Sequence, residues 1–197
     1  MQQTNLSIYN NYPFNPGGNV FTRLLWHYVN AVIFKTGLLP VSGIKVFLLR
    51  LFGAKIGTNV MIKPCVNIKY PWNLTIDNNS WIGENVWIDN LVPVTIGSHV
   101  CISQGAYLCT GNHDWSDPSF GLIVKPISVA DGAWIGAKSV IAPGIQIGES
   151  AIAAAGSVVV KDIPSFEIHA GNPAQFSRRR VFQDAESAKS KTFAQHA

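Results

Sequence analysis

The chain has 197 residues, of which 47% are hydrophobic and 13% are charged, and its net charge is +4. This length and composition predict one domain with a substantial core and exclude a disordered or highly charged chain. Lys and Arg form no dense stripe interleaved with aromatic residues, so the sequence does not favour nucleic-acid binding.

The first segment, residues 1–52, carries no signal-peptide pattern, because its first 14 residues lack the basic-then-apolar order. Residues 24–52 are strongly apolar, yet charged residues and Pro40 break them before about 18 uncharged residues have accumulated. We predict two amphipathic helices, near 20–36 and 41–52. They can cap the core, which we favour, or lie on the inner face of a membrane with Lys45 and Arg50 facing headgroups.

The three cysteines, Cys65, Cys101 and Cys109, form no CxxC pair and no even framework. Such usage fits a reducing compartment, so we expect free thiols in a cytoplasmic protein that is either soluble or peripheral at the membrane.

A six-residue repeat occupies residues 53–165. Aliphatic or small residues lead fifteen repeats: Ile56, Ile62, Ile68, Ile76, Ile82, Ile88, Ile96, Ile102, Leu108, Val129, Ile135, Ile141, Ile147, Ala153 and Val159. The register slips after the third, sixth and ninth repeats, and the longest slip is the excursion 109–128. Insertions that recur every third repeat must project from one corner of a three-sided coil. The sequence therefore predicts an all-β parallel β-helix of about five coils.

Four aromatic residues, Trp81, Trp87, Tyr107 and Trp134, directly precede lead positions, so strand alternation turns them outward. We expect a neighbouring subunit or the N-terminal helices to cover them. Residues 166–197 are predicted to form a turn, a short helix and a tail.

The lead–Gly–x–x–small–x pattern resembles the hexapeptide-repeat acyltransferases, whose fold is a left-handed parallel β-helix, over about residues 50–180. Within that family, TGNH at 110–113, the run 134–164 and AGNPAQFSRRR at 170–180 are similar to the galactoside, maltose and colanic-acid type O-acetyltransferases. LLRLFGAKIG at 48–57 looks most like the colanic-acid, exopolysaccharide-modifying branch.

The resemblance implies direct transfer of an acetyl group from acetyl-CoA to a sugar hydroxyl, with His113 as the general base and no metal. It places the oxyanion donor at the backbone N–H of Ala137 and the pantetheine arm beside Ala137 and Ala155. Lys161 and Arg178 are expected to meet the CoA phosphates. It also implies a homotrimer with active sites between subunits.

Two departures from the family pattern fall in the expected cofactor region. Gln175 stands where arginine is common, and Val160 where threonine is common.

Candidate acceptor-binding residues lie one coil before His113. Asp89 and Asn90 occupy the register positions of Cys109 and Thr110, so stacking places them at the same edge, about 4.8 Å away. They can bind acceptor hydroxyls, or satisfy exposed corner backbone as Asx residues often do.

Two further candidates carry the same ambiguity. For Asn85 we favour the backbone role. Asp114 can bind the acceptor, orient the imidazole or cap the loop, and Asp117 can also orient the imidazole or cap the loop.

Three alternatives remain. An antibiotic acetyltransferase shares the C-terminal signatures and differs only in its acceptor. A γ-type zinc carbonic anhydrase needs three converging histidines, whereas only His99 lies near His113 in sequence. A non-catalytic β-helix binding module would have no reason for both the excursion and the AGNPA turn. The sequence thus favours a sugar O-acetyltransferase without identifying the sugar.

Overall fold

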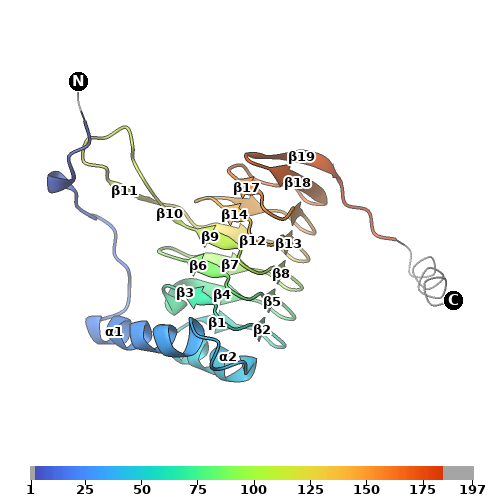
Figure 1. Cartoon of the computed structure of the whole chain (residues 1–197), viewed down its shortest axis with the longest axis horizontal. Coiled ribbons are helices and arrows are strands. Elements are labelled where there is room, and N and C mark those ends of the chain that lie inside the picture. The colour runs from blue at the N-terminus through green and yellow to red at the C-terminus, as the bar shows by residue number, and fades with distance from the viewer. Residues whose placement is uncertain (1–2, 184–197) are drawn as a thin grey trace.

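The computed structural model describes residues 3–183, and short parallel strands wind through them as a three-sided prism (Figure 1). Each coil adds one strand to each of three sheets. The first sheet contains β1 (Lys55–Ile56), β4 (Leu74–Ile76), β7 (Val94–Ile96), β12 (Ile127–Val129) and β15 (Gln146–Ile147). The second contains β2 (Met61–Ile62), β5 (Trp81–Ile82), β8 (Cys101–Ile102), β13 (Trp134–Ile135), β16 (Ile152–Ala153), β18 (Glu167–Gly171) and β19 (Ala174–Arg179). The third contains β3 (Asn67–Ile68), β6 (Trp87–Asp89), β9 (Tyr107–Cys109), β14 (Val140–Ile141) and β17 (Val158–Val159).

The lead residues of the repeat stack on one another inside the prism. Ile56 is in register with Ile76, Ile76 with Ile96, and Ile96 with Val129, and all of them are buried. Five coils are complete, and β18 adds the beginning of a sixth. The predicted parallel β-helix and its six-residue register are confirmed.

The three insertions all leave the corner between the third and first sheets. They connect β3 to β4 through the 3-10 turn η3 (Pro71–Asn73), β6 to β7, and β9 to β12. The longest insertion contains an antiparallel hairpin of its own, β10 (Gly111–His113) and β11 (Leu122–Val124). The expected common corner is confirmed, and the excursion projects from the prism as a ribbon (Figure 1).

Two helices near the N-terminus cover the first coil. These are α1 (Val20–Val29), which continues into the π-helix η2 (Asn30–Phe34), and α2 (Ser42–Leu51). Asn19 begins α1 as its N-cap, because its side chain accepts a hydrogen bond from Thr22 N at 2.8 Å. Trp26 packs toward the prism and donates its indole N–H to Ile68 O at 2.9 Å. The helices lie where the sequence predicted them, and we call residues 20–51 the helical cap.

No helix within residues 3–183 combines the length and the apolar character that crossing a bilayer requires.

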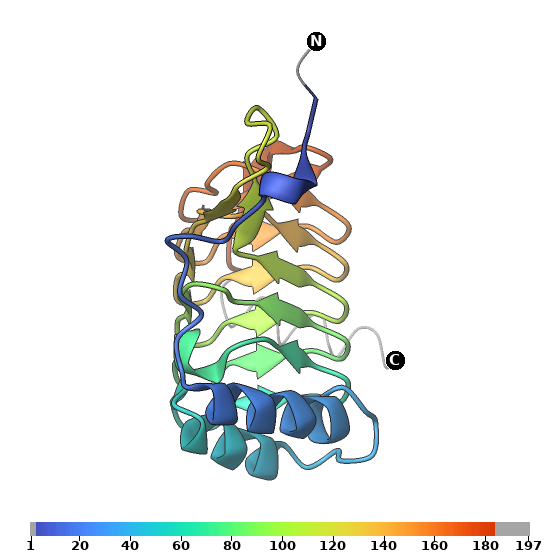
Figure 2. The ribbon, with the colours of Figure 1, turned by 90° about the vertical axis from the view of Figure 1, so that its left-hand side faces the viewer.

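Residues 3–18, which we call the N-terminal strap, run from the helical cap along the prism to the excursion (Figure 2). The strap contains the short turn η1 (Leu6–Ile8). Trp72 holds its lower part by donating to Pro16 O at 2.7 Å, and Asn5 N donates to Pro118 O at 2.8 Å at its upper part. The strap therefore links the η3 turn near the helical cap to the excursion.

The C-terminal part differs from the expected turn and helix. Residues 167–179 form the antiparallel hairpin β18–β19, because β18 continues the second sheet by pairing with β16 and thereby gives β19 an edge to pair with. The expectation for 184–197 lies outside the described residues.

The outward direction of the aromatic residues is confirmed. Trp81, Trp87 and Trp134 are 55%, 42% and 45% exposed, and Trp87 stacks on Tyr107 with ring centroids 4.6 Å apart.

Candidate active site

A cavity of about 370 Å³, which we call the corner cavity, opens where the excursion leaves the prism. The third sheet, the hairpin β10–β11 and the N-terminal strap each contribute to it. It is lined by Tyr9, Asn11, Phe14, Lys69, Tyr70, Asp89, Leu91, Tyr107, Cys109, Gly111, Asn112, His113 and Leu122. Of the residues predicted for the site, it brings together His113 and Asp89.

His113 is held in one orientation by the excursion itself. Its ring stacks on Phe120, with centroids 4.4 Å apart and planes 7° apart, and its Nδ1 lies 2.9 Å from Phe120 O. A carbonyl oxygen can only accept a hydrogen bond, so Nδ1 must carry the hydrogen. In the neutral ring the lone pair is then on Nε2, which is the state that a general base requires.

The strap adds a residue that the sequence analysis missed. The Tyr9 ring lies 5.7 Å from the His113 ring, centroid to centroid, at an interplanar angle of 56°. About a hundred residues separate the two in the chain, and the strap follows no repeat. No periodic signal could have predicted the contact.

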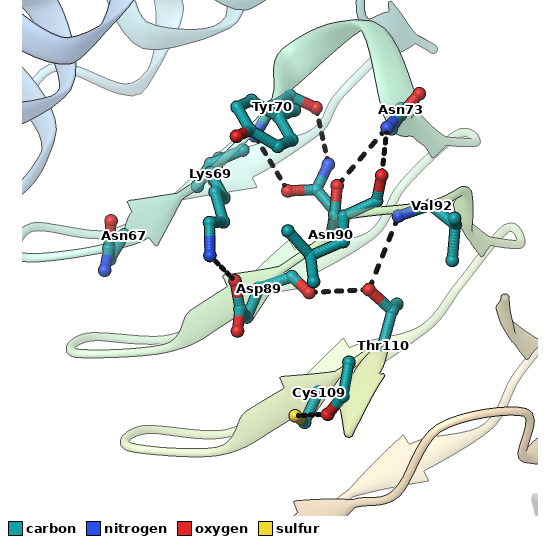
Figure 3. A network of polar contacts seen from close by, with 12 residues as sticks. Asn67, Lys69, Tyr70, Asn73, Asp89, Asn90, Val92, Cys109 and Thr110 are labelled. Carbon is teal, nitrogen blue, oxygen red and sulfur yellow. Dashed lines mark hydrogen bonds and ion pairs between the residues drawn. The ribbon is translucent and has the colours of Figure 1, made fainter. Parts of the chain in front are cut away.

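Asp89 is buried and lines the corner cavity, and Figure 3 shows its carboxylate facing Lys69. Its Oδ1 lies 3.0 Å from Lys69 Nζ, and its Oδ2 accepts from the Tyr107 hydroxyl at 3.3 Å. Burial raises the pKa of Tyr107, and the neighbouring Cys109 and Asp89 raise it further. The phenol therefore stays protonated near neutral pH. Because the Tyr107 hydrogen is directed at Asp89, both side chains present oxygen acceptors to the cavity.

Asn90 has a structural role in this chain. It is fully buried, its Oδ1 accepts from Tyr70 N at 3.0 Å, and its Nδ2 donates to Tyr70 O (Figure 3). Both ends of the amide are used in holding the Tyr70 loop, and Asn90 does not line the corner cavity.

Asn85 and Asp114 also lie outside the corner cavity. Asn85 is exposed with φ of 58°, and it sits at the corner between the second and third sheets. Asp114 accepts hydrogen bonds from the Oγ and N of Ser116, at 2.5 and 3.0 Å, and these bonds lower its pKa. Asp117 likewise accepts from Ser119 N at 2.7 Å. The two aspartates therefore cap the loop, and the Phe120 carbonyl orients the imidazole.

Ala137 and Ala155 lie in one column at the corner between the second and third sheets. Neither backbone N–H has an acceptor within residues 3–183, a property that Glu84 and Gln104 share in the same column. A Cβ on Gly136 would lie 2.4 Å from Ala155 N, so the coils pack backbone to backbone here. Within residues 3–183 these N–H groups therefore remain free to donate hydrogen bonds.

One chain does not bring His113 and Ala137 together. Strand β9 pairs with β14 so that Tyr107 lies opposite Val140, and Leu108 opposite Ile141. His113 follows β9, whereas Ala137 precedes β14. The two residues therefore lie at opposite edges of the third sheet.

Lys161 and Arg178 are exposed and lie apart from each other. Lys161 follows β17, across the third sheet from Ala155. Arg178 pairs with Ile168, at the opposite end of the hairpin from Gly171, which donates to Ser157 Oγ at 3.2 Å beside the Ala155 corner. Arg180 is engaged structurally, since its Nη1 donates to Gly132 O and Ser150 O.

Within the described range 3–183, no three His, Cys, Asp or Glu side chains gather into a group that could hold a metal ion.

The chain matches no model of a protein family. It is 42% identical over 165 residues to a protein of Escherichia coli K12 named "Putative colanic acid biosynthesis acetyltransferase WcaF", a match that covers 84% of this chain and 91% of the relative. It is 34% identical over 128 residues to the galactoside O-acetyltransferase of the same organism, with 64% and 63% covered.

Solved structures give the same result. A hexapeptide-repeat containing acetyltransferase from Vibrio cholerae superposes with a TM-score of 0.74 at 27% identity, covering 82% of this chain and 92% of that one. A galactoside acetyltransferase in complex with coenzyme A superposes with a TM-score of 0.70 at 26% identity, covering 83% and 86%. A β-helix with this register, a histidine on the corner excursion and these relatives agree: the chain belongs to the hexapeptide-repeat acetyltransferases.

Proposed function

We propose that this protein transfers an acetyl group from acetyl-CoA to a hydroxyl of a sugar in exopolysaccharide or other glycan biosynthesis. The observation that carries the proposal is the contact between His113 Nδ1 and Phe120 O, which leaves Nε2 as a proton acceptor in a polar cavity. The 42% identity to a protein named for colanic acid biosynthesis supports the glycan assignment.

In the proposed reaction, His113 Nε2 takes the proton of the sugar hydroxyl as the hydroxyl oxygen attacks the thioester carbonyl. The imidazolium then returns this proton to the departing thiolate. Since Nδ1 stays bonded to the Phe120 carbonyl throughout, the ring does not have to turn between the two proton transfers.

Asp89 and Tyr107 are proposed to bind the acceptor. The Asp89 carboxylate can accept a hydrogen bond from one sugar hydroxyl. The Tyr107 oxygen, whose own hydrogen is directed at Asp89 Oδ2, can accept from another. The Lys69 ammonium lies 3.0 Å from Asp89 Oδ1 and pairs with this carboxylate.

The developing oxyanion requires a hydrogen-bond donor, and we assign this role to the Ala137 N–H of a neighbouring subunit. His113 and Ala137 of one chain lie at opposite edges of the third sheet, so a complete site needs a second copy. A homotrimer satisfies this need in a closed ring, in which each subunit gives its His113 edge to one neighbour and its Ala137 edge to the other.

Acetyl-CoA is proposed to lie along the Ala137–Ala155 column, where it would supply the acetyl group as an activated thioester. The free N–H groups of that column would bind the pantetheine amides. Lys161 and Arg178 remain our candidates for its phosphates, and their separation within one chain is compatible with contributions from two subunits.

We further propose that the helical cap rests on an anionic membrane surface. It exposes large apolar residues on both helices and on the segment between them: Val20, Phe21, Leu24, Leu25, Tyr28, Val32, Leu38, Val41, Ile44, Phe47 and Leu51. The chain has no Asp or Glu before Asp77, so no carboxylate opposes the approach of this end to acidic lipid.

The catalytic proposal is tested by following thiol release from acetyl-CoA with a panel of sugars and one hydroxylated antibiotic. His113→Ala should lower kcat by about 10²- to 10⁴-fold, because the general base is lost. His99→Asn, at an exposed position with φ of 58° that asparagine tolerates, should keep wild-type turnover. Full turnover by His113→Ala would refute the mechanism, and transfer to the antibiotic alone would refute the sugar assignment.

A further inference from the structure

A second concave surface lies between the helical cap and the third sheet. This groove encloses about 350 Å³ and is lined by Arg23, Trp26, His27, Asn30, Lys35, Asn67, Lys69, Tyr70 and Trp87. We call it the basic groove. Neither the base nor the oxyanion donor of the proposed reaction lies in it.

The basic groove gathers positive charge without a carboxylate in its lining. Arg23, Lys35 and Lys69 are cationic. Lys69 is paired with Asp89, whereas neither Arg23 nor Lys35 forms an ion pair with any described residue. The groove thus contains three cationic side chains, two of which have no ion-pair partner among the described residues. Such a concave site favours the binding of an anion that carries more than one charge.

The basic groove and the corner cavity share a wall. Lys69 and Tyr70 line both of them. The stacked rings of Trp87 and Tyr107 form a second connection, because Trp87 lines the groove and Tyr107 lines the cavity. A ligand held in the groove can therefore extend one end toward His113.

We propose that the basic groove binds the phosphate or diphosphate group that carries the acceptor sugar. The inference rests on the proposed function and narrows its substrate class to sugars linked to a phosphorylated carrier. Arg23 and Lys35 would donate to the phosphate oxygens, the exposed face of Trp87 would support a sugar ring, and the sugar's reacting hydroxyl would lie in the corner cavity.

Inorganic pyrophosphate is the first probe, because its binding to the full-length protein can be measured by calorimetry without knowing the sugar. One pyrophosphate should bind per subunit in magnesium-free buffer. Arg23→Gln and Lys35→Gln should each weaken binding about tenfold, since each removes one charged donor.

Lys55→Gln is the matched control. It removes the same charge from an exposed residue of β1, in the first sheet, that does not line the groove. At about 0.1 M salt a remote charge is screened within about 10 Å, so this variant should bind within about twofold of wild type. Absence of binding, or equal weakening by all three variants, would overturn the proposal.

Coenzyme A provides the decisive competition, because it also carries phosphates. Saturating coenzyme A should leave pyrophosphate bound. If it displaces pyrophosphate, or if Arg23→Gln raises KM for acetyl-CoA, the groove belongs to the cosubstrate and the proposal is wrong.

Turnover then identifies the carrier. We would compare UDP-galactose, a galactosyl polyprenyl diphosphate in vesicles, and methyl galactoside, with the corresponding glucose series. The proposal is upheld if one of the two diphosphate-linked sugars is the preferred acceptor and Lys35→Gln lowers kcat/KM for it about tenfold. The preferred acceptor then shows whether the carrier is a nucleotide or a lipid. Preference for the phosphate-free glycoside overturns it. Pyrophosphate binding without acetyl transfer to any sugar would instead refute the proposed function and leave the groove's anion specificity intact.

Discussion

A backbone carbonyl orients the His113 ring. From the sequence, two aspartates, Asp114 and Asp117, were the candidates for this role. Asp114 accepts a hydrogen bond from Ser116, and Asp117 accepts one from Ser119. His113 Nδ1 instead donates to Phe120 O, with 2.9 Å between the two atoms. A carbonyl does not titrate, so the tautomer of His113 cannot be lost by protonation of its partner. Sequence reasoning could not find this contact, because it depends on the backbone conformation of Phe120, whose φ is 54°.

A buried lysine in the helical cap predicts that the stability of the protein depends on pH. Lys45 is fully buried, donates to Lys63 O at 2.8 Å, and has a pKa that burial lowers below the ordinary value of 10.5. Between the lowered pKa and 10.5, the unfolded chain therefore holds a proton that the folded chain has released. Rising pH then disfavours the unfolded state, so stability increases across this window.

Lys45→Met keeps the side-chain volume and removes the titrating group. The free energy of unfolding of wild type minus that of the variant should rise with pH below 10.5 and become level above it. Denaturant melts at a series of pH values measure this difference. A difference independent of pH would show that Lys45 titrates normally.

At the scale of the element, the repeat itself could be read from the sequence. The lead residues alone predicted the strands, the three sheets and the corner from which the excursion departs. The strap and the C-terminal hairpin could not be predicted in this way, because neither follows the six-residue period. Asn90 had the expected position at the corner edge, but only the Tyr70 contacts show that both ends of its amide are used.

The corner glycines set how closely the coils can approach. On Gly136 a Cβ would lie 2.4 Å from Ala155 N and 2.7 Å from Ala153 O, and both neighbours are backbone atoms that cannot rotate away. Gly136→Ala should therefore destabilise the protein by about 1–3 kcal/mol, as overpacking does. Thermal melts measure the loss.

Gly43→Ala is the control for this change. A Cβ at Gly43 meets nothing within 4 Å, and the residue lies in α2. Alanine should be neutral there or stabilise by about 0.5–1 kcal/mol, since glycine is a poor helix former. Equal effects of the two substitutions would contradict the close corner packing.

For the whole molecule, the separation of His113 from Ala137 predicts complementation between two inactive variants. His113→Ala lacks the base. Ala137→Pro lacks the donor N–H and breaks no hydrogen bond among the described residues. If each site takes one group from each of two subunits, randomly mixed trimers should recover about a quarter of wild-type sites.

Activity would be measured on the trimer fraction after subunit exchange. Ala155→Phe, which fills the same corner, serves as a second blocking variant. No recovery with either partner would contradict a site that takes one group from each of two subunits.

The membrane proposal also belongs to this scale. Phe21 and Phe47, which are 82% and 63% exposed, lie on different helices of the cap. Replacing both with Ser should lower binding to vesicles rich in phosphatidylglycerol by about tenfold or more, because apolar burial is lost. Trp115→Ser/Val181→Ser, which removes exposed apolar residues elsewhere, should bind as wild type. Equal partitioning of the two double variants in a sedimentation assay would contradict the proposal.

The strap also constrains the order in which the protein can be completed on the ribosome. Residues 5–14 are synthesised long before residues 109–122, against which the upper strap docks. The coils can form one after another as they emerge, since each needs only its predecessor. Tyr9 has no His113 to face until the third coil and its excursion have been made. The earliest residues of the cavity are therefore among the last to be placed, and the nascent chain gains its active-site wall only when most of the scaffold exists.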